Sequence, residues 1–342
     1  MPDVGSMPRR AAPDDSTLLR VEHLSTGFPV GGHIALAVDD ISFQVRQRET
    51  LGLVGESGSG KSLTALSILR LVEPPGRILS GSVRFRGRDL LTLAESDMRR
   101  VRGAEIALIF QEPMTALNPV FTIGDQIGET LLVHGRATRA DVTAQVVELL
   151  HSVSIPDPAR RADDYPHQLS GGLRQRALIA MALACRPSLV IADEPTTALD
   201  VTIQAQILEL LRDLKVRFDL SLLLITHDLG VIAETADRVA VMYAGRLVET
   251  APVREIFAHP QHPYTKGLLA SMPGGEPGSR LRAVDGTVPG LGSLPAGCAF
   301  APRCPDRFSA CDVEPPAATV VAPHHEVRCY LHGPAAPAEN RH

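Results

Sequence analysis

The chain has 342 residues, of which 44% are hydrophobic and 21% are charged, a composition typical of a folded globular protein with one or two cores. Its formal net charge of -5 and its sequence pI near 6.2 lack the basic excess of nucleic-acid-binding domains, so we expect no nucleic-acid partner. No apolar run in the sequence approaches the roughly 20 residues that a membrane-spanning helix needs.

The N-terminal segment, residues 1–17, contains Pro, Asp and Arg without an apolar core. We interpret this segment as a mobile tail and not as a signal peptide, and we expect a cytoplasmic protein. From Leu18 onward, short apolar strands alternate with amphipathic helices, as in residues 51–54 followed by residues 61–71. This alternation predicts an α/β domain over residues 18–271, built on a parallel sheet that helices cover.

A glycine-rich loop separates the expected strand at 51–54 from the helix that follows it. The loop fits the pattern G-x-x-x-x-G-K-[ST] with Gly55, Glu56, Ser57, Gly58, Ser59, Gly60, Lys61 and Ser62. Glycines let backbone N–H groups curl around phosphate oxygens, and the helix N-terminus adds its positive dipole end. In this context we expect Lys61 to reach the β- and γ-phosphates of ATP and Ser62 to ligate Mg²⁺. A purely structural glycine turn is the alternative.

Strand signals vanish between residues 114 and 186, where helical periods dominate, for example at 123–134 and 139–151. They resume at residues 189–192 and 222–226. We therefore predict a helical subdomain, over about residues 114–186, inserted into the sheet domain.

Two carboxylates follow the expected strand at 189–192. Because this strand ends in Asp193 and Glu194, both side chains are expected beside the nucleotide. Asp193 would hold Mg²⁺ through its coordination shell, and Glu194 would orient and polarise the attacking water. Taken alone, such a pair could also be a solvated helix start.

The run Leu169, Ser170, Gly171 and Gly172, followed by Arg174, Gln175 and Arg176, resembles the signature motif of ABC ATPases. In that family the helix beginning at this motif faces the γ-phosphate of ATP bound to a partner subunit. Ser170 can at the same time be a plain helix N-cap. The resemblance implies a P-loop NTPase fold, with a parallel sheet core, an inserted helical subdomain and a small C-terminal Cys-rich extension.

The remaining motifs of that family appear in order, with Gln111 after the apolar residues 106–110, then Asp200, and His227 after residues 222–226. By resemblance, Gln111 contacts Mg²⁺ and the water, Asp200 communicates across the dimer, and His227 bonds the γ-phosphate. Phe28 stands where the family often carries an aromatic residue that stacks on adenine. A core aromatic is the alternative for Phe28.

A narrower resemblance rests on Leu173, which replaces a common Gln, and on the runs at 111–119 and 262–269. These are similar to the ATP-binding subunits of dipeptide and oligopeptide importers, a group that also includes nickel importers. The resemblance implies ATP hydrolysis coupled to peptide import at the cytoplasmic face of the membrane. It also implies a second ABC ATPase subunit in a heterodimer, two transmembrane permease subunits and an extracytoplasmic substrate-binding protein.

Two other functions stay open at this point. One is import of nickel or another small solute. The other is a role in translation or DNA maintenance, although ABC ATPases of those kinds usually carry two cassettes or a long coiled coil. The sequence shows one set of nucleotide motifs and no coiled-coil interruption.

Residues 272–342 are expected to form a Pro- and Gly-rich linker and a small extension whose last stretch, from residue 333, is disordered. Four cysteines gather there, Cys298, Cys304, Cys311 and Cys329, whereas Cys185 stands alone in an apolar helix pattern. The extension resembles that of importer subunits, some of which carry a [4Fe-4S] cluster, and four thiolates can complete one. Zinc is less favoured because C-x-x-C pairs are missing, and unligated thiols are the third possibility.

Overall fold

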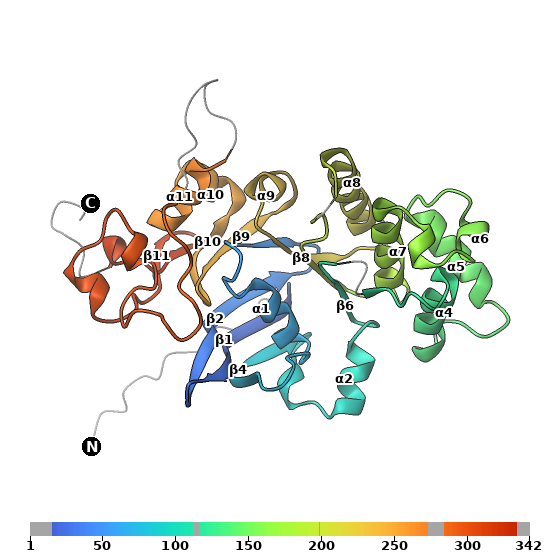
Figure 1. The fold of residues 1–342 in the computed structure, drawn as a ribbon, viewed down its shortest axis with the longest axis horizontal. Helices are drawn as coiled ribbons and strands as arrows, with labels where there is room; N and C mark the ends of the chain where they lie inside the picture. The colour runs from blue at the N-terminus through green and yellow to red at the C-terminus, as the bar shows by residue number, and fades with distance from the viewer. Residues whose placement is uncertain (1–15, 113–115, 198, 273–283, 334–342) are drawn as a thin grey trace, which may run out of the picture.

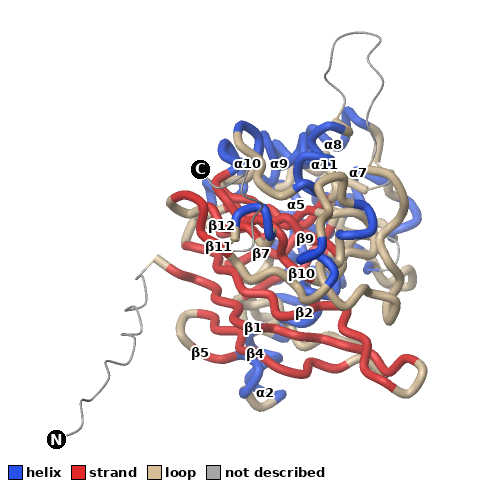
Figure 2. The backbone as a smooth tube through the Cα atoms, turned by 90° about the vertical axis from the view of Figure 1, so that its left-hand side faces the viewer, coloured by secondary structure: helices blue, strands red, loops and turns tan. Residues whose placement is uncertain are grey.

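A computed structural model of the protein describes residues 16–112, 116–197, 199–272 and 284–333. Within these ranges the chain folds into two sheets. The smaller one is antiparallel and has the order β2-β1-β4-β5, with β1 (Thr17–Val30), β2 (His33–Arg46), β4 (Arg77–Phe85) and β5 (Arg88–Asp89). Figure 2 shows this sheet below the larger one. Helix α1 (Lys61–Ile68) contacts both sheets, through β1 and β2 of the smaller one and β7 of the larger one.

The larger sheet has the order β11-β12-β10-β9-β3-β8-β7-β6 in the described residues. Its strands are β3 (Thr50–Val54), β6 (Ile106–Ile109), β7 (Leu189–Asp193), β8 (Ser221–Thr226), β9 (Arg238–Tyr243), β10 (Arg246–Pro252), β11 (Thr319–Ala322) and β12 (His325–Val327). The strands from β9 to β6 run parallel, and every residue of β3, β7 and β8 is buried. Burial on both faces explains their continuous apolar runs and confirms the predicted parallel sheet core.

The two faces of the larger sheet belong to two hydrophobic cores. Successive side chains of β8 point to opposite faces of the sheet, so Leu222 and Leu224 belong to one core and Leu223 and Ile225 to the other. Around the sheet lie η1 (Leu90–Thr92), α2 (Glu95–Val101), α8 (Val201–Arg217), α9 (Leu229–Thr235), α10 (Val253–Ala258) and α11 (Pro263–Ala270). In Figure 1 helices α8 to α11 cover one face, and α1 lies on the other with the antiparallel sheet.

The inserted helices gather at one end of the molecule (Figure 1). They are α4 (Ile123–Val133), α5 (Val142–Ser152), α6 (Pro158–Arg161), η2 (Pro166–Gln168) and α7 (Gly171–Leu183). Thr122 and Asp125 form a capping box that fixes the start of α4. The helix expected from residue 139 begins at Val142, because Asp141 accepts a hydrogen bond from the Thr138 N–H (2.6 Å) and holds the preceding residues in a turn.

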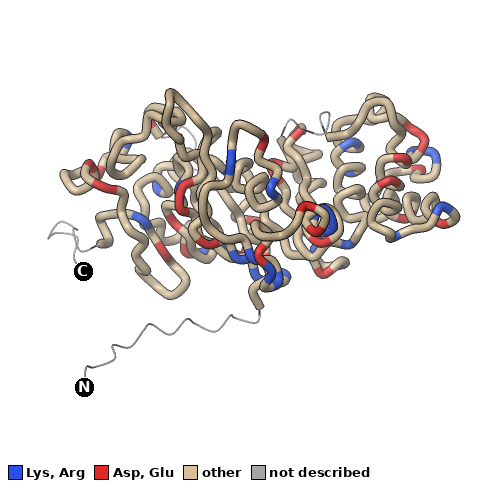
Figure 3. Tube along the Cα trace, turned by 90° about the horizontal axis from the view of Figure 1, so that it is seen from below, with Lys and Arg blue, Asp and Glu red and all other residues tan. Residues whose placement is uncertain are grey.

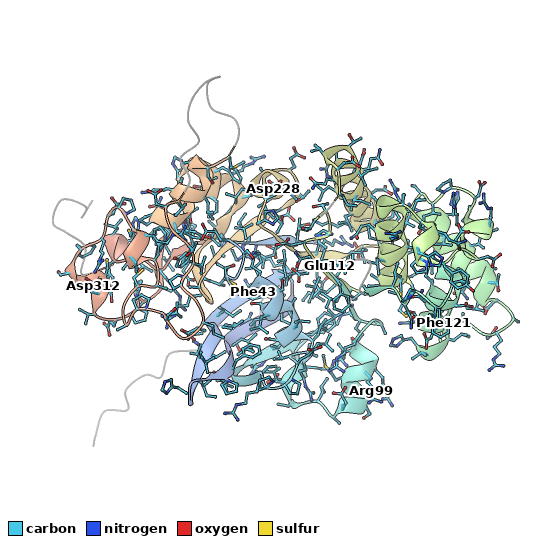
Figure 4. All side chains as sticks on the ribbon, in the orientation of Figure 1. Phe43, Arg99, Glu112, Phe121, Asp228 and Asp312 are labelled. Atoms are coloured by element: carbon cyan, nitrogen blue, oxygen red, sulfur yellow. The ribbon has the colours of Figure 1, made fainter. Side chains whose placement is uncertain are left out.

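The C-terminal extension occupies the opposite end, as the labels of Asp312 and Phe121 show in Figure 4. Besides β11 and β12 it contains η3 (Ala301–Arg303), η4 (Ser309–Asp312) and η5 (Tyr330–His332). Strand β12 pairs antiparallel with β10, with Glu249 opposite Val327, so the extension continues the sheet of the nucleotide motifs. The tail at 1–15, the run at 113–115, the linker at 273–283 and the last stretch at 334–342 lie outside the described residues.

Charged residues of both signs alternate over the molecule when it is seen from below (Figure 3). This mixture agrees with the modest net charge of the sequence. None of the helices described is both long and apolar enough to cross a membrane.

Candidate active site

The glycine-rich loop joins the buried strand β3 to helix α1, as the motif predicts. Gly58 and Gly60 have φ angles of 78° and 103°, a left-handed conformation that side chains rarely adopt. At Gly55 a Cβ atom would lie 2.2 Å from the carbonyl oxygen of Met242, so only glycine fits there. The Lys61 ammonium donates hydrogen bonds to the carbonyl oxygens of Gly55 (2.8 Å) and Glu56 (3.0 Å). Burial lowers the pKa of Lys61.

A cavity of about 330 Å³ opens over this loop. Its lining combines the polar side chains of Lys61, Ser62, Gln111 and Glu194 with several apolar residues. The remaining lining residues are Leu36, Ala37, Ser57, Gly58, Ser59, Gly60, Leu63, Ala244, Gly245, Pro289, Gly290, Leu291 and Leu294. A ligand that carries both charged and apolar parts suits this lining.

Asp193 ends strand β7 beside Ser62, with which it shares a hydrogen bond. Burial raises the pKa of Asp193. Its oxygen Oδ1 is buried and has no hydrogen-bond partner among the described residues. A buried oxygen without a donor is rare in native proteins, and this one needs a cation or a donor from a ligand. Mg²⁺ takes one or two carboxylates together with hydroxyl, phosphate and water oxygens, so these two side chains fit it.

Glu194 lines the cavity and has several polar neighbours. Its oxygen Oε2 accepts hydrogen bonds from Gln111 Nε2 (3.1 Å) and Thr197 Oγ1 (2.8 Å). Nδ1 of His227 lies 3.2 Å from the other oxygen, Oε1. Burial raises the pKa of Glu194, but the hydrogen bonds from Thr197 and His227 outweigh it, and the pKa lies below its ordinary value. The carboxylate is therefore ionised at neutral pH and can accept a proton or orient water.

The backbone of Glu194 supports this arrangement. Its φ angle of 46° is left-handed, which is uncommon for a residue with a side chain and clusters at functional sites. The Glu194 N–H donates to the carbonyl oxygen of Ile225 in β8 (2.9 Å), which holds the turn after β7 against the next strand. The structure thus brings Gln111, Glu194 and His227 together from the ends of three neighbouring strands.

The signature residues lie elsewhere. Ser170 caps α7, since its Oγ accepts a hydrogen bond from the Leu173 N–H (3.4 Å), and Asp200 caps α8 in the same way through the Ile203 N–H (3.0 Å). The two helix starts are neighbours, because a Cβ atom on Gly172 would lie 2.9 Å from Cγ2 of Ile203. None of Ser170, Gly171, Gly172 and Asp200 lines the cavity over the phosphate loop.

Phe28 does not line the cavity either. It lies on β1 opposite Ala35, and its ring covers Gly76, where a Cβ atom would come within 2.4 Å of the ring carbon Cε1. The ring is therefore turned toward the start of β4. The geometry described here does not bring it to the phosphate loop.

Three contacts of the site were not predicted from the sequence. Arg303 of the extension forms a two-pronged ion pair with Glu56 of the phosphate loop, with N–O distances of 2.6 and 2.9 Å. The Tyr264 hydroxyl accepts a hydrogen bond from the Glu56 N–H (2.9 Å). Thr197, which holds Glu194, follows the carboxylate pair in sequence but belongs to none of the motifs noted above. Spacing rules do not reveal such contacts, because they depend on tertiary packing.

The four cysteines of the extension line one small enclosed pocket, and Cys298 N–H donates to the Cys311 carbonyl oxygen (2.8 Å). Burial raises the pKa of the Cys304 thiol to about 11 and that of Cys329 to about 12. Among the described residues, however, no group of three or more His, Cys, Asp or Glu side chains is placed to hold a metal ion. The predicted [4Fe-4S] cluster, and zinc with it, gains no support from this arrangement of thiols.

Two segments of the chain match known protein families. Residues 38–197 match the family described as ABC transporter. Residues 248–311 match the family described as oligopeptide/dipeptide transporter, C-terminal region. The second match runs from strand β10 into the extension and ends at Cys311, before Cys329.

The chain is also similar to whole proteins. The dipeptide transport ATP-binding protein DppD of Bacillus subtilis is 51% identical over 316 residues, covering 92% of this chain and 94% of that protein. The oligopeptide transport ATP-binding protein AppD of the same organism is 50% identical over 320 residues, covering 93% and 97%. A solved dimeric structure of the ATP-binding cassette MJ0796, in a post-hydrolysis state bound to ADP and Pi, is similar with a TM-score of 0.62 at 26% identity, covering 69% of this chain and 99% of that one.

Proposed function

Because this chain belongs to the ABC transporter family, and to its peptide-import ATP-binding subunits along nearly its whole length, we propose that its cavity binds and hydrolyses ATP to power the import of di- and oligopeptides. The ATPase activity and the peptide-import role agree with the predictions from the sequence. The single observation that carries the chemistry is the Glu194 carboxylate, ionised and held in the cavity that the phosphate loop lines.

Each polar side chain has a distinct task in this proposal. The loop N–H groups and the Lys61 ammonium bind the phosphate oxygens of ATP. They stabilise the negative charge that these oxygens carry in the transition state. Ser62 and Asp193 hold Mg²⁺, and the bound ion supplies further charge neutralisation at the phosphates. Glu194 orients and polarises the attacking water, and Gln111 fixes the position of that carboxylate.

His227 changes partner during the cycle in this proposal. Its ring now contacts Glu194 and is 61% exposed, so little packing opposes a rotation toward the γ-phosphate. A hydrogen bond to that phosphate would leave Glu194 with Thr197 and Gln111 alone, and so free one carboxylate oxygen for water.

The other half of the site comes from a second ABC ATPase subunit. Ser170, Gly171, Gly172 and Asp200 lie away from the cavity of their own chain, and an exposed helix start with free N–H groups suits the γ-phosphate of a neighbour. ATP between two such subunits would draw them together, and hydrolysis would release them. The dimeric state of the similar MJ0796 cassette supports this arrangement. We propose a heterodimer in the transporter.

The subunit works on membrane permease partners, as peptide-import ATP-binding subunits of ABC transporters do. We propose two transmembrane subunits, a peripheral position at the cytoplasmic face and an extracytoplasmic binding protein that delivers peptides. Nickel or another small solute is a second candidate, since the site described above is the proposed ATP site and does not select the cargo.

Affinity purification of the tagged chain from mildly solubilised native membranes tests the assembly, with mass spectrometry of everything that accompanies it. Recovery of multispanning proteins, a second ABC ATPase and a binding protein is the expected result, and the ligand of that binding protein identifies the cargo. A tag-only purification is the control. Ribosomal or DNA-repair proteins without membrane partners would refute the transporter role.

The iron–sulfur cluster stays a prediction for the tail cysteines, and no step of ATP hydrolysis is routed through it. Iron, sulfide and zinc analysis of anaerobically purified protein tests it. A chain with neither iron nor zinc would leave Cys298, Cys304, Cys311 and Cys329 as free thiols, the state in which the structure describes them.

A further inference from the structure

A short turn of the C-terminal extension lies in the wall of the nucleotide cavity. Pro289, Gly290, Leu291 and Leu294 line it together with Leu36 and Ala37 of strand β2. The phosphate loop lines the same cavity, and Ala37 lies against it, since a Cβ atom on Gly60 would come within 2.5 Å of the Ala37 carbonyl oxygen. A nucleotide whose phosphates occupy the loop can therefore place its base against the apolar residues that line the same cavity.

The turn is packed and hydrogen-bonded. The Ser293 N–H and hydroxyl both donate to the carbonyl oxygen of Gly290, at 3.0 and 2.8 Å. Gly292 has a φ angle of 88°, and a Cβ atom there would be in van der Waals contact with Val30 Cγ1 (3.6 Å) and Ala35 Cβ (3.8 Å). The turn thus sits on the hairpin formed by β1 and β2.

Arg303, which follows the turn in sequence, forms hydrogen bonds with the residues before the turn and with the phosphate loop. Its guanidinium donates to the carbonyl oxygens of Val284 (3.0 Å) and Asp285 (2.7 Å), which precede the turn, and to the Glu56 carboxylate in the phosphate loop. The Arg303 side chain is only 6% exposed. One buried cation therefore joins the residues just before the turn to the phosphate loop.

The wall presents apolar surface that the protein itself leaves uncovered. Leu291 is 42% exposed, and Val30 and Ile34 on the neighbouring hairpin are each 39% exposed. Phe28, the expected stacking residue, is turned toward Gly76 instead. A flat purine base placed here would remove apolar surface from water at the mouth of the cavity.

We propose that the turn Pro289–Leu294 is the base-binding wall of the nucleotide site, with Leu291 and Leu294 in contact with the purine of ATP. This inference rests on the proposed function, because it takes ATP as the ligand. It makes the extension part of the ATP site of its own chain. The ligand chemistry it selects is an aromatic base joined to a polyphosphate.

Two probes separate base binding from phosphate binding, namely a non-hydrolysable ATP analogue and inorganic tripolyphosphate, which has no base. The full chain carrying both Leu291→Ser and Leu294→Ser is titrated with each probe in the presence of Mg²⁺. We expect the Kd for the ATP analogue to rise about tenfold, or about 1.4 kcal/mol, because each leucine loses part of its apolar contact. The Kd for tripolyphosphate should stay unchanged.

Val313→Ser is the matched control, since Val313 is a 72% exposed apolar residue of the same extension that does not line the cavity. Leu291→Met, which keeps an apolar contact, should retain the affinity for the ATP analogue. Equal weakening of both probes would overturn the proposal, because the turn would then only support the phosphate loop. Unchanged binding of both probes by the double variant would overturn it as well. A wild-type chain that binds neither probe would refute the ATP site itself.

Discussion

Arg303 contacts both carboxylate oxygens of Glu56, at 2.6 and 2.9 Å, across 247 residues of sequence. The pair joins the extension to the second residue of the phosphate loop. Both side chains are largely shielded, with 6% of Arg303 and 27% of Glu56 exposed. Two parallel N–H···O bonds fix the orientation of both groups, which a single contact would not do.

Arg303→Met should lower the free energy of unfolding by about 2 kcal/mol, since it leaves the Glu56 carboxylate without its cation. Urea unfolding of the full chain measures this. Arg307→Met is the control, because Arg307 pairs with Asp312 in the same two-pronged geometry, but both side chains are about half exposed (50% and 47%). We expect little change there. An equal loss in both variants would show that burial does not decide the strength of these pairs.

Glu194→Gln should leave ATP binding intact and lower kcat at least about 100-fold, because the amide cannot accept a proton from water. ATP hydrolysis by the assembled transporter and binding of a fluorescent ATP analogue measure the two effects. Glu209→Gln, on the exposed side of α8, is the control for the removal of one negative charge. Undiminished hydrolysis in Glu194→Gln would refute the assigned role.

Thr197→Val should shift the acidic limb of the pH–rate profile to higher pH. The Thr197 hydroxyl stabilises the ionised form of Glu194 and holds its pKa down, so its removal raises that pKa. Glu194 acts only when it is ionised. On acidification, the variant therefore loses ATPase activity at a higher pH than the wild type does. A variant with lower kcat at every pH and an unchanged limb would assign Thr197 a packing role only.

His262 makes stability depend on pH. Its ring is buried, and burial lowers its pKa from 6.5 to about 3. Between these values the unfolded chain binds a proton that the folded chain does not, so this group lowers the free energy of unfolding by about 1.4 kcal/mol per unit of falling pH. His262 Nδ1 also accepts the Tyr264 N–H (3.0 Å) at the start of α11.

His262→Asn should keep a capping acceptor and remove the titration. We therefore expect the difference in unfolding free energy between wild type and variant to shrink as the pH falls from 7 to 5. Urea titrations at several pH values measure it. Parallel pH curves for the two proteins would contradict the depressed pKa.

Local sequence patterns predicted the parts of the site that local structure builds. The loop from Gly55 to Ser62 is fixed by the strand before it and the helix after it, so its conformation follows from a few adjacent residues. Glu194 and His227 follow buried strands whose apolar runs are plain in the sequence. Because neighbouring parallel strands end at one edge of a sheet, it could also be predicted that Glu194 and His227 lie close together.

Non-local contacts could not be predicted in this way. Strands β11 and β12 are short and partly exposed, and they join the sheet through the pairing of β12 with β10, whose residues are more than 70 positions apart. The position of Phe28 depends on Gly76, which leaves room for the ring. The domain limits at residues 17 and 271, and the state of the four tail cysteines, stay predictions.

Because the chain is synthesised from its N-terminus, the two residues of the Glu56–Arg303 pair are made at different times. The ribosome adds Arg303 247 residues after Glu56, so the phosphate loop is made well before its partner. N-terminal parts of a chain generally fold first. A nascent or truncated chain that stops before Arg303 thus carries a complete phosphate motif without its anchor. The contact that anchors Glu56 therefore forms only after Arg303 has been made, so the phosphate loop and its anchor are completed at separate stages of synthesis.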